Sequence, residues 1–325
     1  MDHADLDLLF ADPLPPGRLL FLNASPHPAL AAARDRMTCV QGWKPAADAL
    51  LRAGLTLAAA DGMYDAAFVR LGRQREVNRA TLARALDALG PEGTLHLAGS
   101  NALGAASYEK DLKKLGLDGP SRSKGKARLF VATRGTADPA AWRGLDAPRA
   151  LGATGFVTAP GVFAWDRIDA GSQLLATHIP ADLSGLAADL GAGWGYLADA
   201  VLARAPAVER LDAFEADSAA VDCLARNLAP YGARARTFWH DVATGVGTAI
   251  YDAILVNPPF HDARGENRAL GRRFVAVAAE ALKPGGCVWL VANRHLAYEQ
   301  MLSEKFGEVR RLAEDAAFKV YTARK

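Results

Sequence analysis

The chain has 325 residues, of which half are hydrophobic and 23% are charged, and its formal net charge is +2. This balance excludes a disordered or fibrous protein, and the length suits two domains that each bury a core. The sequence lacks a signal peptide, a C-x-x-C pair and any apolar run near the roughly 20 residues of a membrane span, so we expect a cytoplasmic protein without a metal site.

The first half is predicted to contain a strand, a helix and a second strand in sequence. The first strand covers residues 64–69, the helix covers 76–89, and the second strand covers 94–98 after the turn Gly90-Pro91-Glu92-Gly93. Proline and small residues over 138–148 are typical of a linker.

The second half alternates short apolar runs with helical patterns, which is typical of a parallel sheet covered by helices. The predicted strands are residues 186–190, 210–214, 234–239, 251–256 and 287–292. The predicted helices are residues 196–205, 218–228 and 269–282, and the last ends at the turn Lys283-Pro284-Gly285-Gly286.

The two halves share one sequence phrase. Tyr64-Asp65-Ala66 opens the first copy and Tyr251-Asp252-Ala253 opens the second, and each copy later reaches a proline–glycine turn. We interpret the repeat as an internal duplication, with an N-terminal domain of residues 1–148 and a C-terminal domain of residues 149–325. The alternative is two unrelated α/β domains that share a common phrase.

Basic residues outnumber acidic ones by eight to two between residues 110 and 134. This excess predicts a surface that faces phosphate groups, and the alternative is a solvated helix and loop. The basic residues are Lys110, Lys113, Lys114, Arg122, Lys124, Lys126, Arg128 and Arg134.

A glycine loop, Gly191-Ala192-Gly193-Trp194-Gly195, follows the first strand of the second half and leads into a helix. Glycines at a helix N-terminus let a ligand approach the backbone closely. The G-x-G-x-G spacing differs from the dinucleotide fingerprint, and Asp189 before it suits a ligand with a cationic amino group. Glu215 and Asp241 end the next two strands, where they can reach a ribose and an adenine or are ordinary surface acids.

The loop, the later acids and Asn257-Pro258-Pro259-Phe260 resemble a class I S-adenosylmethionine-dependent methyltransferase. The stretches GVFAWDRIDAGSQLL, NPPFHD and VANRHLAYE are similar to the bacterial ribosomal small-subunit methyltransferase C family, and the likeness covers residues 155–325. The resemblance implies an α/β fold of two tandem Rossmann-like class I methyltransferase domains, the N-terminal one degenerate.

The same resemblance implies an enzyme that transfers a methyl group from S-adenosyl-L-methionine to the exocyclic N2 of a guanine in ribosomal RNA, with 16S RNA as the expected target. Ribosomal RNA or the small ribosomal subunit is then the expected partner, and we expect a monomer. The residues that it assigns to the cofactor are Asp189, Gly191, Gly193, Gly195, Glu215, Asp241 and Asn257.

The Asn-Pro-Pro-Phe stretch suits a reaction at a planar amino group, whose lone pair is delocalised and therefore a poor nucleophile. The side-chain oxygen of Asn257 and the carbonyl of Pro258 can accept hydrogen bonds from the two amino hydrogens and direct the lone pair toward a methyl group. Pro258 and Pro259 restrict the backbone that holds both acceptors, and Phe260 can stack on the base. His261 can accept a proton or form a hydrogen bond.

Adenine N6, guanine N2 of large-subunit RNA and glutamine amides are alternative planar nitrogens that such an enzyme could methylate. A non-catalytic RNA-binding assembly factor is an alternative of another class.

In the first half, residues 21–28 stand where the glycine loop would be and contain no glycine. Arg70-Leu71-Gly72-Arg73 stands in place of Asn-Pro-Pro-Phe and offers cations suited to phosphate. We therefore expect the first domain to position RNA and to support the second without binding cofactor.

Overall fold

The computed structural model describes residues 4–259 and 266–325, without the side chains of residues 266–268. Phe260 and His261 lie outside the described residues. The chain forms two compact units, Met1–Ala147 and Pro148–Lys325. Their boundary lies one residue before the one that the sequence analysis assigns.

The first unit contains a seven-stranded sheet in the order β3-β2-β1-β4-β5-β7-β6. The strands β1 to β5 are parallel, whereas β7 runs antiparallel to both β5 and β6. The strands are β1 (Leu19–Leu22), β2 (Met37–Val40), β3 (Thr56–Leu57), β4 (Tyr64–Arg70), β5 (Leu89–Ser100), β6 (Ser121–Lys124) and β7 (Ala127–Thr133). The α-helices are α1 (Ala4–Leu9), α2 (Lys44–Arg52), α3 (Arg75–Asp87) and α4 (Ala105–Lys114).

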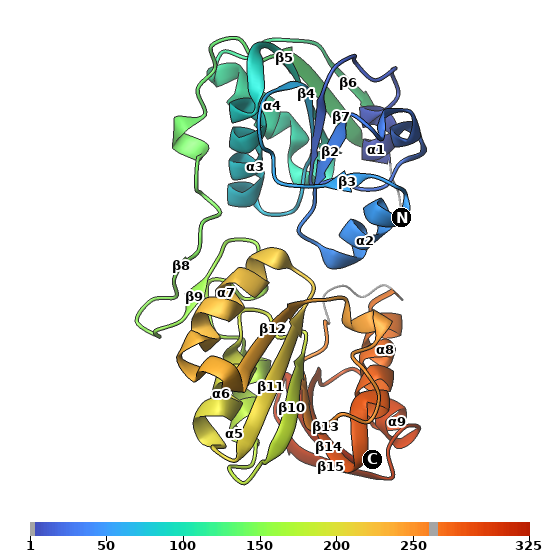
Figure 1. The fold of residues 1–325 in the computed structure, drawn as a ribbon, viewed down its shortest axis with the longest axis vertical. Helices are drawn as coiled ribbons and strands as arrows, with labels where there is room; N and C mark the ends of the chain where they lie inside the picture. Colours follow the sequence, from blue (N-terminus) through green and yellow to red (C-terminus); the bar gives the residue numbers. More distant parts are fainter. Residues whose placement is uncertain (1–3, 260–265) are drawn as a thin grey trace. The chain divides into compact units, whose positions relative to one another are not determined.

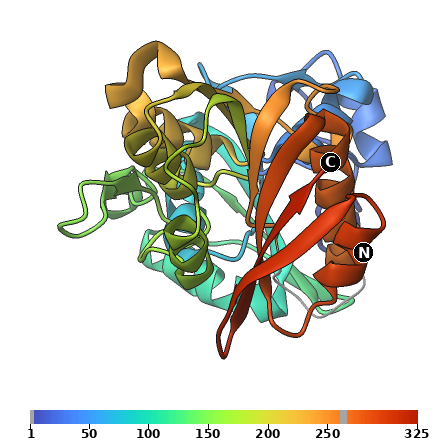
Figure 2. The ribbon, with the colours of Figure 1, turned by 90° about the horizontal axis from the view of Figure 1, so that it is seen from below.

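The second unit repeats this sheet in the order β12-β11-β10-β13-β14-β16-β15, and a short hairpin of β8 (Arg149–Ala150) and β9 (Val157–Thr158) precedes it. The antiparallel hairpin of β15 and β16, red in Figure 2, forms one edge of the sheet. The strands are β10 (Gly185–Leu190), β11 (Val208–Glu215), β12 (Ala235–Trp239), β13 (Tyr251–Val256), β14 (Leu282–Asn293), β15 (Glu308–Glu314) and β16 (Phe318–Arg324). The α-helices are α5 (Ala170–Thr177), α6 (Tyr196–Arg204), α7 (Ser218–Leu228), α8 (Glu266–Ala281) and α9 (Tyr298–Ser303).

The identical strand order in the two units confirms the predicted pair of tandem α/β domains. Helices cover both faces of the second sheet, with α5, α6 and α7 on one face and α8 and α9 on the other (Figure 1). Each face has its own apolar core: Leu175, Val201 and Leu224 belong to the first, and Val277 and Leu302 belong to the second. Burial on both faces explains why these strands read as continuous apolar runs.

Parallel pairing brings the carboxyl ends of β10, β11 and β13 to one edge of the second sheet. Leu190 at the end of β10 lies opposite Phe214 of β11 and Val256 of β13. The glycine loop, Glu215 and Asn257 therefore leave the sheet side by side, which is where α/β proteins bind ligands.

The structure refines two sequence predictions about local structure. Residues 90–93 and 283–286 pair with no residue of β4 and β13, as the predicted turns imply, but they lie within β5 and β14 because the leucine before each stretch is also paired. The unit boundary lies within the predicted linker, residues 138–148, but most of this stretch belongs to the first unit: Trp142 is buried there and Arg143 donates two hydrogen bonds to Asp87. None of the helices in the described ranges is long and apolar enough to cross a membrane.

Replacing Trp142 by alanine is expected to destabilise the first unit by about 3 kcal/mol, because a large buried side chain leaves a cavity. Hydrogen exchange of the amides of β4 and β5 in the full chain measures this loss. Trp43→Ala is the matched control, since the Trp43 side chain is 49% exposed and its removal should change the exchange free energy by under about 1 kcal/mol. Equal effects of the two variants would contradict the packing role of Trp142.

Candidate active site

The glycine loop adopts a backbone that only glycine adopts easily. Gly191, Gly193 and Gly195 all have positive φ angles, of 78°, 56° and 100°. A Cβ atom on Gly195 would lie 2.7 Å from a methyl group of Leu224 in α7, whereas a Cβ on Gly193 would meet nothing within 4 Å. Packing therefore requires Gly195, while the backbone at Gly193 is open to a ligand.

Glu215 fixes this loop through its carboxylate. One oxygen accepts a hydrogen bond from the backbone N–H of Gly193 at 2.8 Å, and the other accepts from Ala216 at 2.7 Å and Asp217 at 2.8 Å. Burial raises the pKa of Glu215, and the three backbone donors oppose that rise. Glu215 is thus held in a fixed orientation at the strand end before any ligand binds.

Asp189 is a buried carboxylate without a partner. Its side chain is 1% exposed, and neither oxygen has a hydrogen bond in the described part of the chain. Burial raises its pKa to about 7, and the nearby negative charge of Glu215 adds to the rise. The backbone N–H of Ala198, which is too poorly placed for an ordinary hydrogen bond, opposes the rise. An unsatisfied buried acid stores free energy that a cationic or hydrogen-bond-donating ligand can release.

Asn257 follows β13 and is held by the N-cap residue of α5 and by a residue of its first turn. Its amide nitrogen donates to Oδ2 of Asp169 at 3.0 Å and to Oγ of Ser172 at 2.8 Å. Asp169 is also the N-cap of α5, where Oδ2 accepts from the backbone N–H of Ser172 at 2.8 Å. The next residue, Pro258, is buried, and Pro259 is exposed.

A pocket lies between the glycine loop, residues 163–172 and Asn257. Its walls include Gly191, Gly193 and Asn257 among the predicted site residues, and Asp169 and Ser172 as unpredicted ones. The remaining wall residues are Phe163, Ala164, Ala192, Trp194, Tyr196 and Leu197. Asp189, Gly195, Glu215, Asp241 and Pro258 surround the same strand ends but do not line this pocket.

Asp241 has a structural partner at the end of β12. Its carboxylate accepts a hydrogen bond from the backbone N–H of Ala243 at 2.9 Å and caps a short 3-10 helix, Val242–Thr244. The sequence left open an ordinary surface acid at this strand end, and the capping role is a structural function of that kind. The second oxygen of Asp241 makes no hydrogen bond within the described residues, so a ligand contact stays a prediction.

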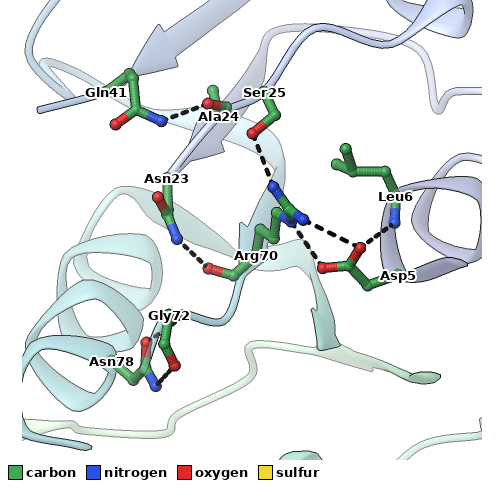
Figure 3. A network of polar contacts seen from close by, with 9 residues as sticks. All are labelled: Asp5, Leu6, Asn23, Ala24, Ser25, Gln41, Arg70, Gly72 and Asn78. Carbon is green, nitrogen blue, oxygen red and sulfur yellow. Dashed lines mark hydrogen bonds and ion pairs between the residues drawn. The ribbon is translucent and has the colours of Figure 1, made fainter. Parts of the chain in front are cut away.

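The first unit carries a closed version of the same site (Figure 3). Leu22 pairs with Val40 and Val69 as Leu190 pairs with Phe214 and Val256, so Asn23, Gln41 and Arg70 occupy the positions of Gly191, Glu215 and Asn257. Asn23 keeps a positive φ angle of 53°, as Gly191 does.

The closure depends on the side chain of Arg70. Its guanidinium donates to both carboxylate oxygens of Asp5, at 2.7 and 3.2 Å, and to Oγ of Ser25 at 3.0 Å (Figure 3). Asp5 is buried, so the pair neutralises an interior charge. The prediction that Arg70 contacts phosphate is therefore wrong, because the carboxylate of Asp5 already takes up its charge.

Phe163, Asp169 and Ser172 lie in the stretch GVFAWDRIDAGSQLL, but no role was predicted for them from the sequence. An Asp just before a helical pattern is a helix-start signal, which could have placed Asp169 at an N-cap. Its second partner, Asn257, lies 88 residues away in sequence, and no local pattern connects the two.

Comparisons with known proteins agree with the fold and show the family. The family model described as "Methyltransferase small domain" matches residues 153–322. The ribosomal RNA small subunit methyltransferase C of Shewanella pealeana is 30% identical over 271 residues, which cover 81% of this chain and 78% of the relative. That of Pseudomonas paraeruginosa is 34% identical over 269 residues, which cover 81% of this chain and 80% of the relative.

A solved structure is similar over both units. The T. thermophilus 16S rRNA N2 G1207 methyltransferase, in complex with AdoMet and guanosine, superposes with a TM-score of 0.83 at 28% sequence identity. The match covers 100% of this chain and 92% of that one. The likeness therefore includes the first unit as well as the second.

Asp189→Asn is expected to stabilise the protein increasingly as the pH rises. The pKa of Asp189 is higher in the folded state than in the unfolded state, so ionisation opposes folding: the penalty is absent below about pH 4, grows up to about pH 7 and then levels off. Each pKa unit corresponds to about 1.4 kcal/mol. Urea unfolding of the full chain between pH 4 and pH 8 measures the difference between variant and wild type.

The control for this series is Asp182→Asn, which removes an exposed carboxylate from the same unit. A pH-independent difference between Asp189→Asn and wild type would show that the pKa of Asp189 is the same in the folded and unfolded states. A difference that instead favours the wild type more as the pH rises would show that an unseen partner stabilises the ionised carboxylate.

Proposed function

Because the chain belongs to the ribosomal RNA small subunit methyltransferase C family, we propose that it transfers a methyl group from S-adenosyl-L-methionine to the exocyclic N2 of a guanine in 16S ribosomal RNA. The observation that carries the proposal is the amide of Asn257, whose nitrogen is fully engaged and whose oxygen is left for the pocket. An oxygen acceptor is what a planar amino group needs at this position.

The residues around the glycine loop fit the cofactor. We assign Gly191, Gly193 and Gly195 to its methionine end, since the backbone at Gly193 is open to close approach. The buried, unpartnered carboxylate of Asp189 suits the cationic amino group, which would favour the ionised acid. Glu215 has one of its lone-pair sites left after three backbone bonds and suits a ribose hydroxyl.

Asp241 completes the proposed cofactor site beside the adenine. When bound, S-adenosyl-L-methionine supplies an electrophilic methyl group on a positively charged sulfur. The protein is therefore expected to bind and orient both reactants, with no need for a general base or a metal ion. We expect one cofactor per chain, because the Arg70–Asp5 pair fills the matching position of the first unit.

The second unit raises the reactivity of the guanine amino group by hydrogen bonding. Asn257 Oδ1 and the carbonyl oxygen of Pro258 accept bonds from the two N2 hydrogens, which favours a pyramidal nitrogen with a directed lone pair. The nitrogen–carbon bond forms as the carbon–sulfur bond breaks, and the extra proton on N2 leaves to water. Pro258 and Pro259 hold the acceptors in place, and Phe260 is assigned to stacking on the extruded base.

The first unit supplies a cationic surface for RNA. Structure reduces the predicted patch, because Lys113 and Arg128 pair with Glu109 and Arg122 pairs with Asp12. Four exposed cations have no ion pair within the described residues, and we call them the lysine patch: Lys110, Lys114, Lys124 and Lys126. They lie on α4 and at the turn between β6 and β7, two elements that flank the same edge of the sheet.

We infer that the first unit positions RNA through the lysine patch and supports the catalytic second unit. The expected substrate is ribosomal RNA or the small ribosomal subunit, and the expected location is the cytoplasm, where the subunits are assembled. We propose that the chain acts as a monomer, since each copy holds one complete site.

Asn257→Ala is expected to abolish methylation of RNA while leaving cofactor affinity within a few fold, because the lost oxygen acts on the amino group in the transition state. Mass spectrometry of nucleosides from 16S RNA incubated with the full chain measures the product, and titration calorimetry measures the cofactor. N2-methylguanine formed at the wild-type rate by the variant would refute the proposed mechanism.

Charge reversal of the lysine patch to glutamate is expected to weaken RNA binding and to flatten its salt dependence. Each lost phosphate contact removes about 0.9 from the logarithmic slope for a duplex and about 0.7 for a single strand. Lys305→Glu, which reverses an exposed cation of the second unit, is the control. An unchanged slope in the patch variant would leave these lysines as solvated surface.

A further inference from the structure

We propose that Asp169 and Ser172 are positioning residues that set the orientation of the Asn257 amide. The inference depends on the proposed function, because it explains why the oxygen of Asn257, and not its nitrogen, faces the substrate amino group. An amide with the reverse orientation would present its own hydrogens to the hydrogens of the substrate, and no hydrogen bond could form.

The donor pattern of the three side chains allows one orientation. The carboxylate of Asp169 has acceptors and no hydrogen to donate, so only the NH2 group of Asn257 can lie 3.0 Å from its Oδ2. The second hydrogen of that NH2 group is taken by Oγ of Ser172 at 2.8 Å. Both hydrogens are therefore used, and Oδ1 of Asn257 remains as an acceptor at the pocket wall.

Asp169 and Ser172, which bind the Asn257 amide, are themselves fixed in place. Oδ2 of Asp169 also accepts the backbone N–H of Ser172 at 2.8 Å, which makes Asp169 the N-cap of α5. Ser172 is 8% exposed, and Leu175 of the same helix is fully buried. Since α5 packs on β14 and α6, the two acceptors cannot follow a rotation of the Asn257 amide.

The first unit also has a carboxylate that binds the residue at the end of its fourth strand, but that residue is an arginine. Its α1 precedes β1 and packs on β5 and β7, as α5 precedes β10 and packs on β14 and β16. Asp5 in α1 binds the side chain of Arg70, the residue that matches Asn257 in strand register. In both units, a carboxylate in or next to the helix before the first strand of the sheet thus holds the residue at the carboxyl end of the fourth strand.

The two units differ in which hydrogen-bonding atoms remain free on the residue that the carboxylate holds. Arg70 has only donors, so holding it leaves no acceptor, and the first unit cannot orient an amino group. Asn257 has an oxygen on the far side of the amide, so holding its nitrogen exposes an acceptor. The second unit is therefore expected to need both Asn257 and its holders for full activity.

The first test measures hydrogen exchange of the Asn257 side-chain amide in the absence of RNA and cofactor. The full chain is labelled with 15N-asparagine. The side-chain NH2 hydrogens of Asn257 are expected to exchange slowly with solvent in the wild type. Their exchange rate should be at least tenfold higher in the double variant Asp169→Ser/Ser172→Ala. Asn257→Ala assigns the signal. Exchange in the wild type as fast as that of an exposed asparagine would overturn the inference.

The second test separates positioning from folding. Serine is a good N-cap, so Asp169→Ser keeps α5 capped but is too short to reach Asn257. We expect the single-turnover rate of 16S RNA methylation to fall about tenfold in Asp169→Ser and in Ser172→Ala and about a hundredfold in the double variant, as for loss of a preorganised transition-state contact. The affinity for S-adenosyl-L-methionine should stay within threefold.

Two further variants complete the design. Asp169→Asn still offers a side-chain oxygen to Ser172 and Asn257, so it should restore most of the activity that Asp169→Ser loses. Asp252→Asn is the matched control, because Asp252 also accepts a backbone N–H bond, that of Leu186 at 2.8 Å, but at the opposite edge of the sheet. Its rate should equal that of the wild type.

The outcomes distinguish the inference from the proposed function. Wild-type methylation together with an unimpaired Asp169→Ser/Ser172→Ala variant would refute the positioning role and leave the function intact. A wild-type chain that fails to methylate guanine N2 would refute the function, and the exchange of the Asn257 amide would still decide the geometry.

Discussion

The parallel pairing of β10 with β11 on one side and β13 on the other is the constraint on which the site depends. It aligns Leu190 with Phe214 and Val256, so three chain segments leave the sheet at the same level. Because parallel strands need long crossovers, the loop, Glu215 and Asn257 come from distant parts of the sequence and meet only in the folded sheet. A shift of one residue in any pairing would turn these side chains to the other face.

The two units share one strand order but use the residues at the strand ends differently. In the second, Glu215 accepts the N–H of Gly193 and fixes the loop. In the first, the side-chain amide of Gln41 donates to the carbonyl of Ala24 (Figure 3). The side-chain oxygen of Gln41 also accepts from the backbone N–H of Trp43. Both contacts tie a strand end to the neighbouring loop. The difference is that at these strand ends the first unit pairs Arg70 and Gln41 with groups of its own, while the second leaves acceptors for a ligand.

The two units also differ in the energetic cost of a buried acid. The first unit compensates its buried Asp5 with Arg70, but the second leaves Asp189 buried and unpartnered, which opposes folding until a ligand binds. The same low exposure that penalises Asp189 strengthens its interaction with a bound cation. Binding function and local stability are therefore in conflict at this residue, as is common where a site is preorganised.

The sequence by itself determined the tandem α/β fold, the glycine loop and the Asn-Pro-Pro-Phe stretch, because these depend on local patterns: apolar runs of strand length, glycine at positive φ and proline next to the reacting amide. Only the tertiary structure decided which atoms remain available. Asp169 holds Asn257 across 88 residues and Asp5 holds Arg70 across 65, and Glu109 neutralises part of the basic run. Hydrogen bonds and ion pairs of this kind depend on how distant segments meet after folding, so composition and spacing could name the charged and polar residues but not their partners.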